Sequence, residues 1–441
     1  MHSTPGSPPS DTAPTGEPAP RAITDHPGGL LAYLVRIPTF SAFRYPQYRL
    51  LWYGQVGNAL AFWMDQVTRG WLMYELTGSA VQLGAVTFIR AAPLLLLSPI
   101  AGTMADRRGR KSQLILAQGV NAALYGILAV LIVTHLVHPW HVYAMAVSSA
   151  IVQVFQGPAR QAMQTEVVEP RDITNAIGVS SIAFNASRSI GPAIAGIVIA
   201  VWGTGGAYFV QAAMFLVSTI WTVQLQGDPP RALNPVKRGP GPSFLSSTVE
   251  GWRFVLKSET VRTGMLVMMM TSFFAASFST LLPIFAKDIL QHGATGQGFL
   301  LTAMGIGALM SSVLIASLGD KLPKGLLIVG GSFAYGALLV FFAASQWFAV
   351  SAALMVVIGL VNVWCNALVQ TVVQANAPSA IRGRVMGVFQ QRELFLTAGS
   401  MAIGALAAIW GAPAAVAAMG AACALASVLI YVAIPHIRTI R

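Results

Sequence analysis

The stretch GTMADRRGRK, from Gly102 to Lys111, decides how the fold of this chain is interpreted. It places one acid, Asp106, and four basic residues directly after a long apolar run. The small residues Gly102 and Ala105 let two helix backbones approach closely, and Asp106 can neutralise the positive N-terminal end of a neighbouring helix. We therefore predict a cytoplasmic turn between two membrane helices that can latch helices together and release them.

The composition of the 441-residue chain agrees with a membrane protein. Apolar residues make up 55% and charged residues only 10%, with a mean hydropathy of +0.64. The net charge of +12 would also suit a nucleic-acid binder. That class is excluded because the basic residues lie in short loops between apolar runs. The two cysteines, Cys365 and Cys423, lie inside apolar runs, so no disulfide framework is predicted.

Twelve apolar runs of spanning length follow residue 47. The first six cover about 48–74, 79–104, 112–134, 140–165, 173–200 and 204–226, and the second six cover about 261–286, 295–319, 325–345, 347–374, 383–410 and 412–434. The two sets of six repeat one another, because Asp106 recurs as Asp320 and Gln164 recurs as Gln370, each pair at the cytoplasmic ends of equivalent runs.

The segments outside the runs complete the predicted domain organisation. Residues 1–28 are rich in Pro, Ser, Thr and Gly and predict a disordered cytoplasmic tail. Residues 29–47 alternate apolar and basic residues and predict a segment on the membrane surface. The remaining units are an N-terminal six-helix half at 48–226, a Pro-rich cytoplasmic linker with an amphipathic helix at 227–260, a C-terminal six-helix half at 261–434 and a cytoplasmic tail at 435–441.

Loop charges predict the orientation. Basic residues gather in the loops on one side of the runs, whereas the opposite loops offer essentially only Lys287. Because basic loops stay in the cytoplasm, both termini are expected there, in a multi-pass protein of a bacterial inner membrane.

The opening stretch resembles the loop signature Gly-x-x-x-Asp-Arg-x-Gly-Arg-Arg/Lys of the major facilitator superfamily. It matches at Gly102, Asp106, Arg107, Gly109, Arg110 and Lys111. The resemblance implies an all-α fold of twelve transmembrane helices in two pseudo-symmetric six-helix halves, with the substrate bound between the halves. In that arrangement the stretch becomes a conformational latch, in which Asp106 meets the start of run 11 near Arg384 when the cytoplasmic side is closed.

Two further stretches refine the resemblance. In run 5, Ser187, Gly191, Pro192, Ala195 and Gly196 resemble the Gly-x-x-x-Gly-Pro-x-x-Gly-Gly signature of the exporting, antiporter branches. Three segments resemble the branch of enterobactin exporters and macrolide or multidrug efflux proteins. They are WYGQVGNALAFWMDQVTRGWLMYELTGSA, GPARQAM and RGRVMGVFQ. In run 4 the neutral Gln153 replaces the arginine that exporters often carry, and Arg90, Arg160 or Arg188 could take its place.

Charged residues inside the runs need a partner, a watery cavity or a function. Asp65 and Arg69 stand at i and i+4, a spacing that permits an ion pair, and Arg90 lies at a similar depth. Arg188 also lies at this depth, so these four residues are expected to form one network, either for proton coupling through Asp65 or as a static lock of the N-terminal half.

In the C-terminal half, Arg392 and Glu393 are the only deep charges. Adjacent residues of a helix point about 100° apart, so these two are not expected to pair with each other. Either Glu393 joins the proton-coupling residues, with one of the two facing the cavity, or both snorkel or meet the linker and inner loops.

By the resemblance, runs 1, 4, 7 and 10 line the cavity. The substrate-binding candidates on these runs are Asn58, Phe62, Gln153, Gln156, Met270, Phe274, Ser277, Phe278, Asn362 and Asn366. Met270, Phe274 and Phe278 share one helix face at i, i+4 and i+8, and Met and aromatic side chains adapt to varied lipophilic ligands. About half of the lining residues are expected to pack between helices instead.

These features predict a monomeric secondary active exporter of lipophilic or amphiphilic small molecules, of the drug or siderophore class, that exchanges them for protons. The alternatives are a proton-coupled nutrient or metabolite importer, or a lipid transporter of the same fold. No enzyme activity, cofactor or metal is expected. The histidines near 135–141 lack the Cys or carboxylate partners of a zinc site, and no phosphate-binding loop or serine elbow occurs.

Overall fold

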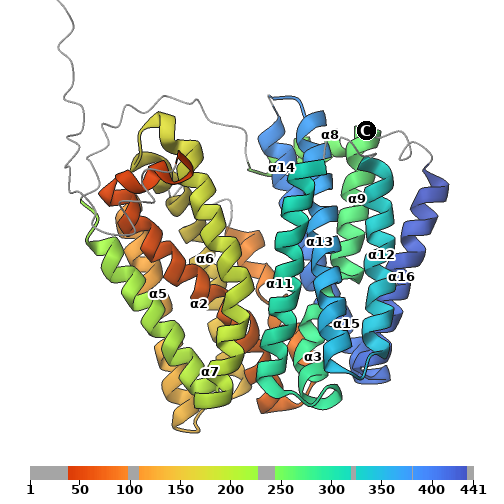
Figure 1. The fold of residues 1–441 in the computed structure, drawn as a ribbon, viewed down its shortest axis with the longest axis horizontal. Helices are drawn as coiled ribbons and strands as arrows, with labels where there is room; N and C mark the ends of the chain where they lie inside the picture. The colour runs from red at the N-terminus through yellow and green to blue at the C-terminus, as the bar shows by residue number, and fades with distance from the viewer. Residues whose placement is uncertain (1–37, 98–108, 227–243, 319–323, 380, 435–441) are drawn as a thin grey trace, which may run out of the picture.

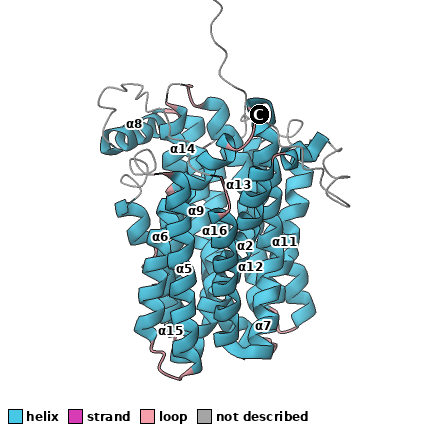
Figure 2. Ribbon diagram, turned by 90° about the vertical axis from the view of Figure 1, so that its left-hand side faces the viewer, coloured by secondary structure: helices cyan, strands magenta, loops and turns pink. Residues whose placement is uncertain are grey.

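The computed structural model describes residues 38–97, 109–226, 244–318, 324–379 and 381–434, and in these ranges every regular element is a helix (Figure 2). The first part of the chain forms the short 3-10 helices η1 (Pro38–Arg44) and η2 (Pro170–Asp172) and the α-helices α2 (Pro46–Thr77), α3 (Ala80–Phe88), α5 (Arg110–Val133), α6 (Pro139–Glu166) and α7 (Ile173–Val223). The α3 helix breaks at residues 89–90, and the chain is helical again from 91 to 97.

The second part of the chain begins with helix α8 (Phe244–Lys257), which lies across the ends of the other helices in Figure 2. It continues with α9 (Glu259–Phe274), η3 (Ala276–Leu281), α10 (Leu282–Ile284), η4 (Phe285–Ile289), α11 (Gly293–Leu318), α12 (Lys324–Ala344), α13 (Phe348–Asn376), α14 (Arg382–Gln390), α15 (Arg392–Trp410) and α16 (Ala412–Ala433).

The described helices account for twelve crossings of a membrane. Nine stretches in the described ranges are long and apolar enough to span a bilayer, and one of them, Pro170–Val223, is 54 residues long. That stretch folds back at Gly203, where the left-handed φ of 70° favours glycine, and so supplies two crossings. Helices α2 and α6 are more polar and supply the other two crossings.

The helices form two bundles, which confirms the all-α, two-half architecture. Figure 1 shows α2, α5, α6 and α7 on one side and α9, α11, α12, α13 and α16 on the other. A turn at Gly411, with φ of 82°, joins α15 to α16 in the same way that Gly203 joins the two arms of α7. The correspondence of these turns is what a repeat of six helices requires.

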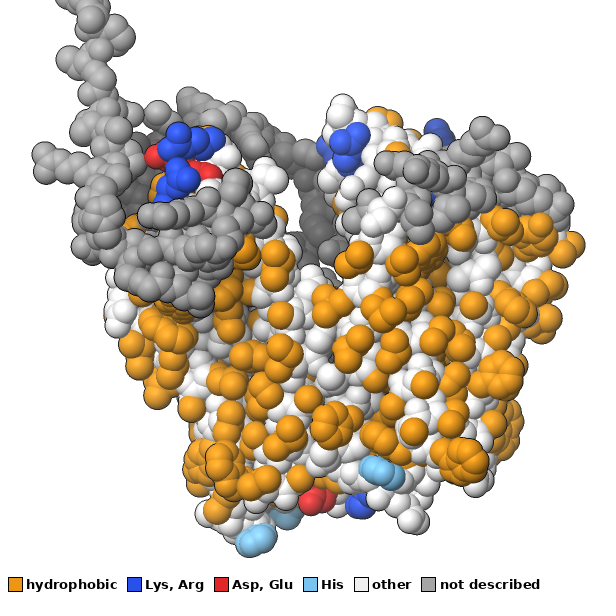
Figure 3. Space-filling model, viewed as in Figure 1, with side chains coloured by type: hydrophobic (Ala, Val, Ile, Leu, Met, Phe, Trp, Pro, Cys, Tyr) orange, Lys and Arg blue, Asp and Glu red, His pale blue; other side chains and the backbone are white. Residues whose placement is uncertain are grey.

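Apolar side chains cover the outside of the bundles (Figure 3). Leu116, Ile127 and Leu425 are each about 60% exposed, which would be costly in water and is favourable in lipid. The interior of each half has its own core, with Leu72, Tyr125 and Tyr208 in one and Phe278, Tyr335 and Phe342 in the other.

The two halves touch at one end and separate at the other. At the closed end α15 packs on α3, where a Cβ added to Gly404 would lie 2.6 Å from the carbonyl oxygen of Ala80. Helix α11 packs on α7 in the same manner, and a Cβ on Gly196 would lie 2.7 Å from the carbonyl oxygen of Ala294. Small residues therefore let both seams close backbone to backbone.

The opposite end is hollowed between the halves (Figure 3). We call this hollow the cleft. Between the halves Ser189 of α7 meets Gly305 of α11, and the neighbouring Arg188 interacts electrostatically with Arg392 of the other half. Helix α8 lies at the open end, where Glu250 forms an ion pair with Arg384 of α14 and the Trp252 indole donates a hydrogen bond to the Gln391 side chain at 3.0 Å.

Candidate functional site

A buried carboxylate lies behind the N-terminal wall of the cleft. Asp65 of α2 has a side chain only 1% exposed and forms an ion pair with Arg69, one helical turn further on. The spacing of four residues permitted that pair, which the structure confirms. Arg90 adds a second guanidinium, whose Nη1 lies 3.8 Å from the Asp65 carboxylate. One carboxylate therefore holds two arginines.

Arg90 connects this carboxylate to the polar face of α6. It lies at the break after α3 and donates hydrogen bonds to the hydroxyl of Ser149 and to the side-chain oxygen of Gln153, both at 3.3 Å. Gln153 occupies the position where the resemblance expects an arginine. The positive charge is instead supplied by Arg90, which follows α3. Its guanidinium donates to the side-chain amide of Gln153, the residue that stands in place of the arginine.

Arg188 does not join this group, which corrects the prediction of a single network. Its guanidinium lies over the Trp63 ring, 5.5 Å from the ring centre. Two residues apart on a helix, Trp63 and Asp65 point about 200° from one another. Because α7 packs on the Trp63 side of α2, where a Cβ on Gly191 would lie 2.8 Å from the Trp63 Cβ, Arg188 meets the ring and not the carboxylate.

Arg188 instead faces the charges of the C-terminal half. It lies within electrostatic range of Arg392 and Glu393 of α15 and of Tyr335 of α12. The proton-coupling candidates therefore divide into one group behind the wall, centred on Asp65, and a second group that spans the cleft.

The second group is tied into the C-terminal half by side-chain amides. Arg392 donates to the side-chain oxygen of Asn366, whose amide donates to the carbonyl oxygen of Asn362 at 2.7 Å. The Asn362 amide in turn donates to the Tyr335 hydroxyl at 3.3 Å. These contacts link α15, α13 and α12 and fix the position of the Arg392 side chain.

Arg392 and Glu393 also pair with each other, contrary to the expectation for adjacent helical residues. The Arg392 Nε lies 3.4 Å from the Glu393 carboxylate. The physical reason is that α14 ends at Gln390 and α15 begins at Arg392, so the pair occupies the first turn of a new helix and not the middle of a continuous one. The Glu393 side chain is 45% exposed, so the helices do not enclose it.

Aromatic and amide side chains of α2 contact α6 and α7 in the N-terminal half. The rings of Phe62, Trp63 and Phe184 form one cluster, with ring centres 5.3 to 6.4 Å apart. The Asn58 side chain accepts a hydrogen bond from Gln156 at 2.8 Å, which joins α2 to α6. Phe184 of α7 was not among the sequence candidates, because a lone phenylalanine in an apolar run gives no signal of its surroundings.

The predicted wall of run 7 is wrong for two of its residues. Phe278 is 1% exposed and packs edge-on against Phe342, inside the core of the C-terminal half. The Ser277 hydroxyl is buried and donates to the carbonyl oxygen of Phe273. The α-helix changes to the 3-10 helix η3 after Phe274, so the i, i+4, i+8 relation ends there. Met270 and Phe274 are half-buried against the same core.

The latch is described only in part. Gly102, Asp106 and Arg107 lie outside the described residues. Gly109 caps the N-terminal end of α5, and Arg110 forms an ion pair with Glu166 of α6. Arg384 pairs with Glu250 of α8, a contact that the sequence did not predict.

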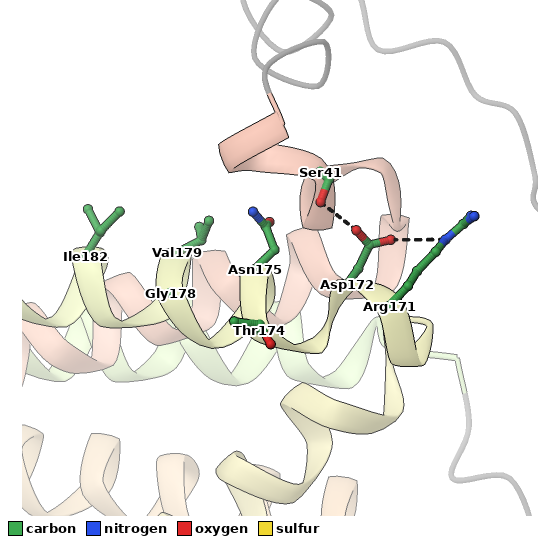
Figure 4. A pocket seen from close by; sticks show the side chains of 8 residues that line it. All are labelled: Ser41, Arg171, Asp172, Thr174, Asn175, Gly178, Val179 and Ile182. Carbon is green, nitrogen blue, oxygen red and sulfur yellow. Dashed lines mark hydrogen bonds and ion pairs between the residues drawn. The ribbon is translucent and has the colours of Figure 1, made fainter.

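A separate small pocket lies at the start of α7 (Figure 4). There the Ser41 hydroxyl donates to the Asp172 carboxylate at 2.6 Å, and Arg171 pairs with the same carboxylate at 3.7 Å. Asp172 lies 16 residues before Arg188 along the chain, about 24 Å at the helical rise, so its contacts are remote from Arg188. Its contacts hold η1 against α7.

Comparison with known proteins identifies a consistent set of relatives. The family model described as "transmembrane secretion effector" matches residues 37–440. The staphyloferrin A transporter of Staphylococcus aureus (strain NCTC 8325 / PS 47) is 24% identical over 360 residues, which cover 80% of this chain and 87% of that protein. The multidrug efflux pump Tap of Mycolicibacterium fortuitum is 26% identical, over 72% of this chain and 78% of the pump.

Two further comparisons concern a more distant relative and the fold. Macrolide efflux protein A of Streptococcus pyogenes is 23% identical, over 65% of this chain and 70% of that protein. Among solved structures, the nucleoside transporter NupG superposes with a TM-score of 0.68 at 14% identity, covering 88% of this chain and 99% of NupG. At that identity the likeness shows the fold, which is that of major facilitator transporters.

Proposed function

The chain belongs to the transmembrane secretion effector family of the major facilitator superfamily, and on that premise we propose that it exports lipophilic or amphiphilic small molecules in exchange for protons. The family makes it a multi-pass membrane transporter and not an enzyme. The names of its relatives support export, since two of those described are efflux proteins.

The orientation follows from the basic residues at the open end of the cleft. By their place at the ends of the helices, the described basic residues at that end are Arg44, Arg49, Arg110, Lys111, Arg171, Arg253, Lys257, Arg262, Lys324, Arg382 and Arg384, whereas Lys287 is the one described lysine or arginine at the closed end. By the positive-inside rule the open end faces the cytoplasm, and both termini do so as well. The conformation is then the inward-open state, ready to take substrate from the cytoplasm or the inner leaflet.

The substrate site is the cleft, between the aromatic cluster of Phe62, Trp63 and Phe184 and the amides of the opposite wall. An apolar wall with a few oriented polar groups suits amphiphilic molecules of varied shape. Export requires the halves to rock, so that the backbone seams at Gly404 and Gly196 part and the cytoplasmic end closes.

The buried carboxylate of Asp65 is the single observation that carries proton coupling. A charged group this deep is expensive, and its two arginines balance it only while it is ionised. Protonation removes the negative charge and releases Arg69 and Arg90. Because Arg90 holds Gln153, that release is transmitted to the cleft wall. Glu393, which the helices do not enclose, is the second candidate for the same role.

Reconstitution into lipid vesicles tests the direction and the coupling. The probe is 1-pyrenebutanol, an uncharged amphiphile that carries no proton itself. We expect accumulation in vesicles with an acidic lumen, because protons leaving the lumen drive probe inward, and no accumulation when the gradient is reversed. Accumulation only with an acidic exterior would instead identify an importer. Movement of labelled phospholipid between leaflets, with no pyrenebutanol accumulation, would identify a lipid transporter.

A further inference from the structure

The charged residues within the described spans carry an excess of arginine. Asp65 balances one of its two arginines, and Glu393 balances Arg392. Arg160 and Arg188 have no carboxylate within ion-pair distance among the described residues. The walls of the cleft are therefore net positive, which is unfavourable in a low-dielectric region unless an anion is present for part of the cycle.

Arg188 and Arg392 bring like charges together from opposite halves. Each contacts its own half, Arg188 at the Trp63 ring and Arg392 at the Asn366 side chain. Their charges repel across the cleft. Glu393, already paired with Arg392, offsets only part of that repulsion.

The unsatisfied polar atoms around this pair are hydrogen-bond donors. The Trp63 Nε1 is buried without a hydrogen-bond partner, and the Arg392 Nε, which lies in the ion pair with Glu393 at 3.4 Å, makes no hydrogen bond. Arg160 shows the same condition at its Nη2, on the face of α6 that also carries Gln153 and Gln156. Donors without hydrogen-bond acceptors, next to the Arg188 guanidinium that no carboxylate pairs with, are complementary to the oxygens of a carboxylate or phosphate.

We propose that the exported molecule carries an acidic group, a carboxylate or phosphate, which binds between Arg188 and Arg392 while its apolar part lies against Phe62 and Phe184. This inference rests on the proposed export function and names its substrate class. Guanidinium groups bind such oxyanions with two parallel hydrogen bonds. Arg160, further toward the open end on α6, attracts the acidic group into the cleft.

Binding of the acid also favours closure of the cleft. The anion cancels the repulsion between Arg188 and Arg392, so the two halves can approach only when the substrate is bound or the charges are otherwise neutralised. A ligand that interacts more strongly with the closed state shifts the equilibrium toward it. Occupied and empty transporters would thus differ in the separation of the walls.

Equilibrium binding to the purified full-length protein tests the proposal with three probes of one shape. 1-Pyrenebutyrate is an anion, 1-pyrenebutanol is neutral and 1-pyrenebutylamine is a cation, all with the same ring and chain. We expect the anion to bind at least about tenfold more tightly than the alcohol, the gain of one charge-assisted contact, with the amine weakest. Equal affinities, or a preference for the amine, would overturn the proposal.

Variants locate the binding site. Arg188→Gln and Arg392→Gln should each lower the affinity for pyrenebutyrate by about tenfold to a hundredfold. The affinity for pyrenebutanol should stay within about twofold of the wild-type value. Arg188→Lys keeps the charge and should recover part of the affinity, which a misfolded variant would not do. The matched control is Arg253→Gln, an exposed arginine of α8, which should bind all three probes as the wild type does. An equal loss of affinity for all three probes would mean that the arginines only stabilise helix packing, which would contradict the proposal.

Further measurements distinguish a lipid headgroup from a transported acid as the bound anion. They also distinguish failure of the acidic-substrate proposal from failure of the export proposal. If phosphatidylglycerol in the nanodisc competes with pyrenebutyrate, and pyrenebutyrate itself is never transported, the site holds a lipid headgroup and the substrate claim fails. If pyrenebutanol accumulates with an acidic lumen but the anion does not bind preferentially, export stands and the acidic substrate fails. If the anion binds as described but no gradient drives any probe, the export function fails and the anion site stands.

Discussion

Gly404→Ala should disfavour the conformation in which α15 is closed on α3, which is the inward-open state in the orientation that we propose. The new Cβ would lie 2.6 Å from the carbonyl oxygen of Ala80 and 3.3 Å from the Cα of Gly84, both backbone atoms that no side-chain rotation can move. Ordinary contacts begin near 3.4 Å, so the seam between α15 and α3 has to widen by most of an ångström. Overpacking of this kind costs about 1–3 kcal/mol.

That cost applies mainly to the state in which the seam is closed. The outward-open state separates α15 from α3 and relieves the contact, so the equilibrium should move toward it by about 5-fold to 150-fold. Spin labels on the outer ends of α3 and α15, measured by double electron–electron resonance, should show a larger population of long distances. Labels across the cleft should show the opposite change.

Gly119→Ala is the matched control, because a Cβ at that position on α5 meets nothing within 4 Å. It should leave both distance distributions unchanged. The reasoning is refuted if Gly404→Ala keeps the wild-type distribution at both ends, or if it only lowers the amount of folded protein. Either result would mean that the seam is a permanent part of the fold and does not open during transport.

Three further variants test other parts of the account. Asp65→Asn should still bind 1-pyrenebutanol but lose accumulation driven by an acidic lumen, and full accumulation would assign coupling to Glu393. Asp106→Asn should widen the cytoplasmic seam in label-distance measurements if that residue is the latch, whereas a wild-type distribution would exclude it. Phe278→Ala should lower the free energy of unfolding by about 3–5 kcal/mol, because it leaves a cavity in the core. Phe274→Ala should lower the affinity for large ligands about tenfold to a hundredfold and leave the stability near normal. Thermal unfolding and binding to probes of two sizes distinguish these last outcomes.

The sequence predicted those features that depend on composition and short spacing. Twelve apolar runs were visible because each must cover a bilayer with few charges, and the ion pair of Asp65 with Arg69 follows from four residues of helix. The Gly102–Lys111 stretch and the signature around Gly191 gave the family. These signals act within one helix or one turn and need no knowledge of packing.

The features that could not be predicted from the sequence depend on which faces of the helices contact one another and on where the helices are interrupted. Arg188 was assigned to Asp65 by depth alone, but the rotation of α7 on α2 places it over Trp63. Arg392 reaches Glu393 because the run is interrupted at residue 391, and Phe278 turns into the core because η3 replaces the regular helix. No periodicity in a uniformly apolar run marks such breaks.

Proton movement in proteoliposomes tests the central claim most directly. A pH-sensitive dye is trapped in the lumen at equal pH on both sides, and 1-pyrenebutanol is added outside. Entry of the neutral probe should raise the lumenal pH, because one or more protons leave as the probe enters, and the change should be absent with Asp65→Asn. Probe entry through the wild-type protein without any change in lumenal pH, or an equal change with Asp65→Asn, would contradict proton exchange at this carboxylate.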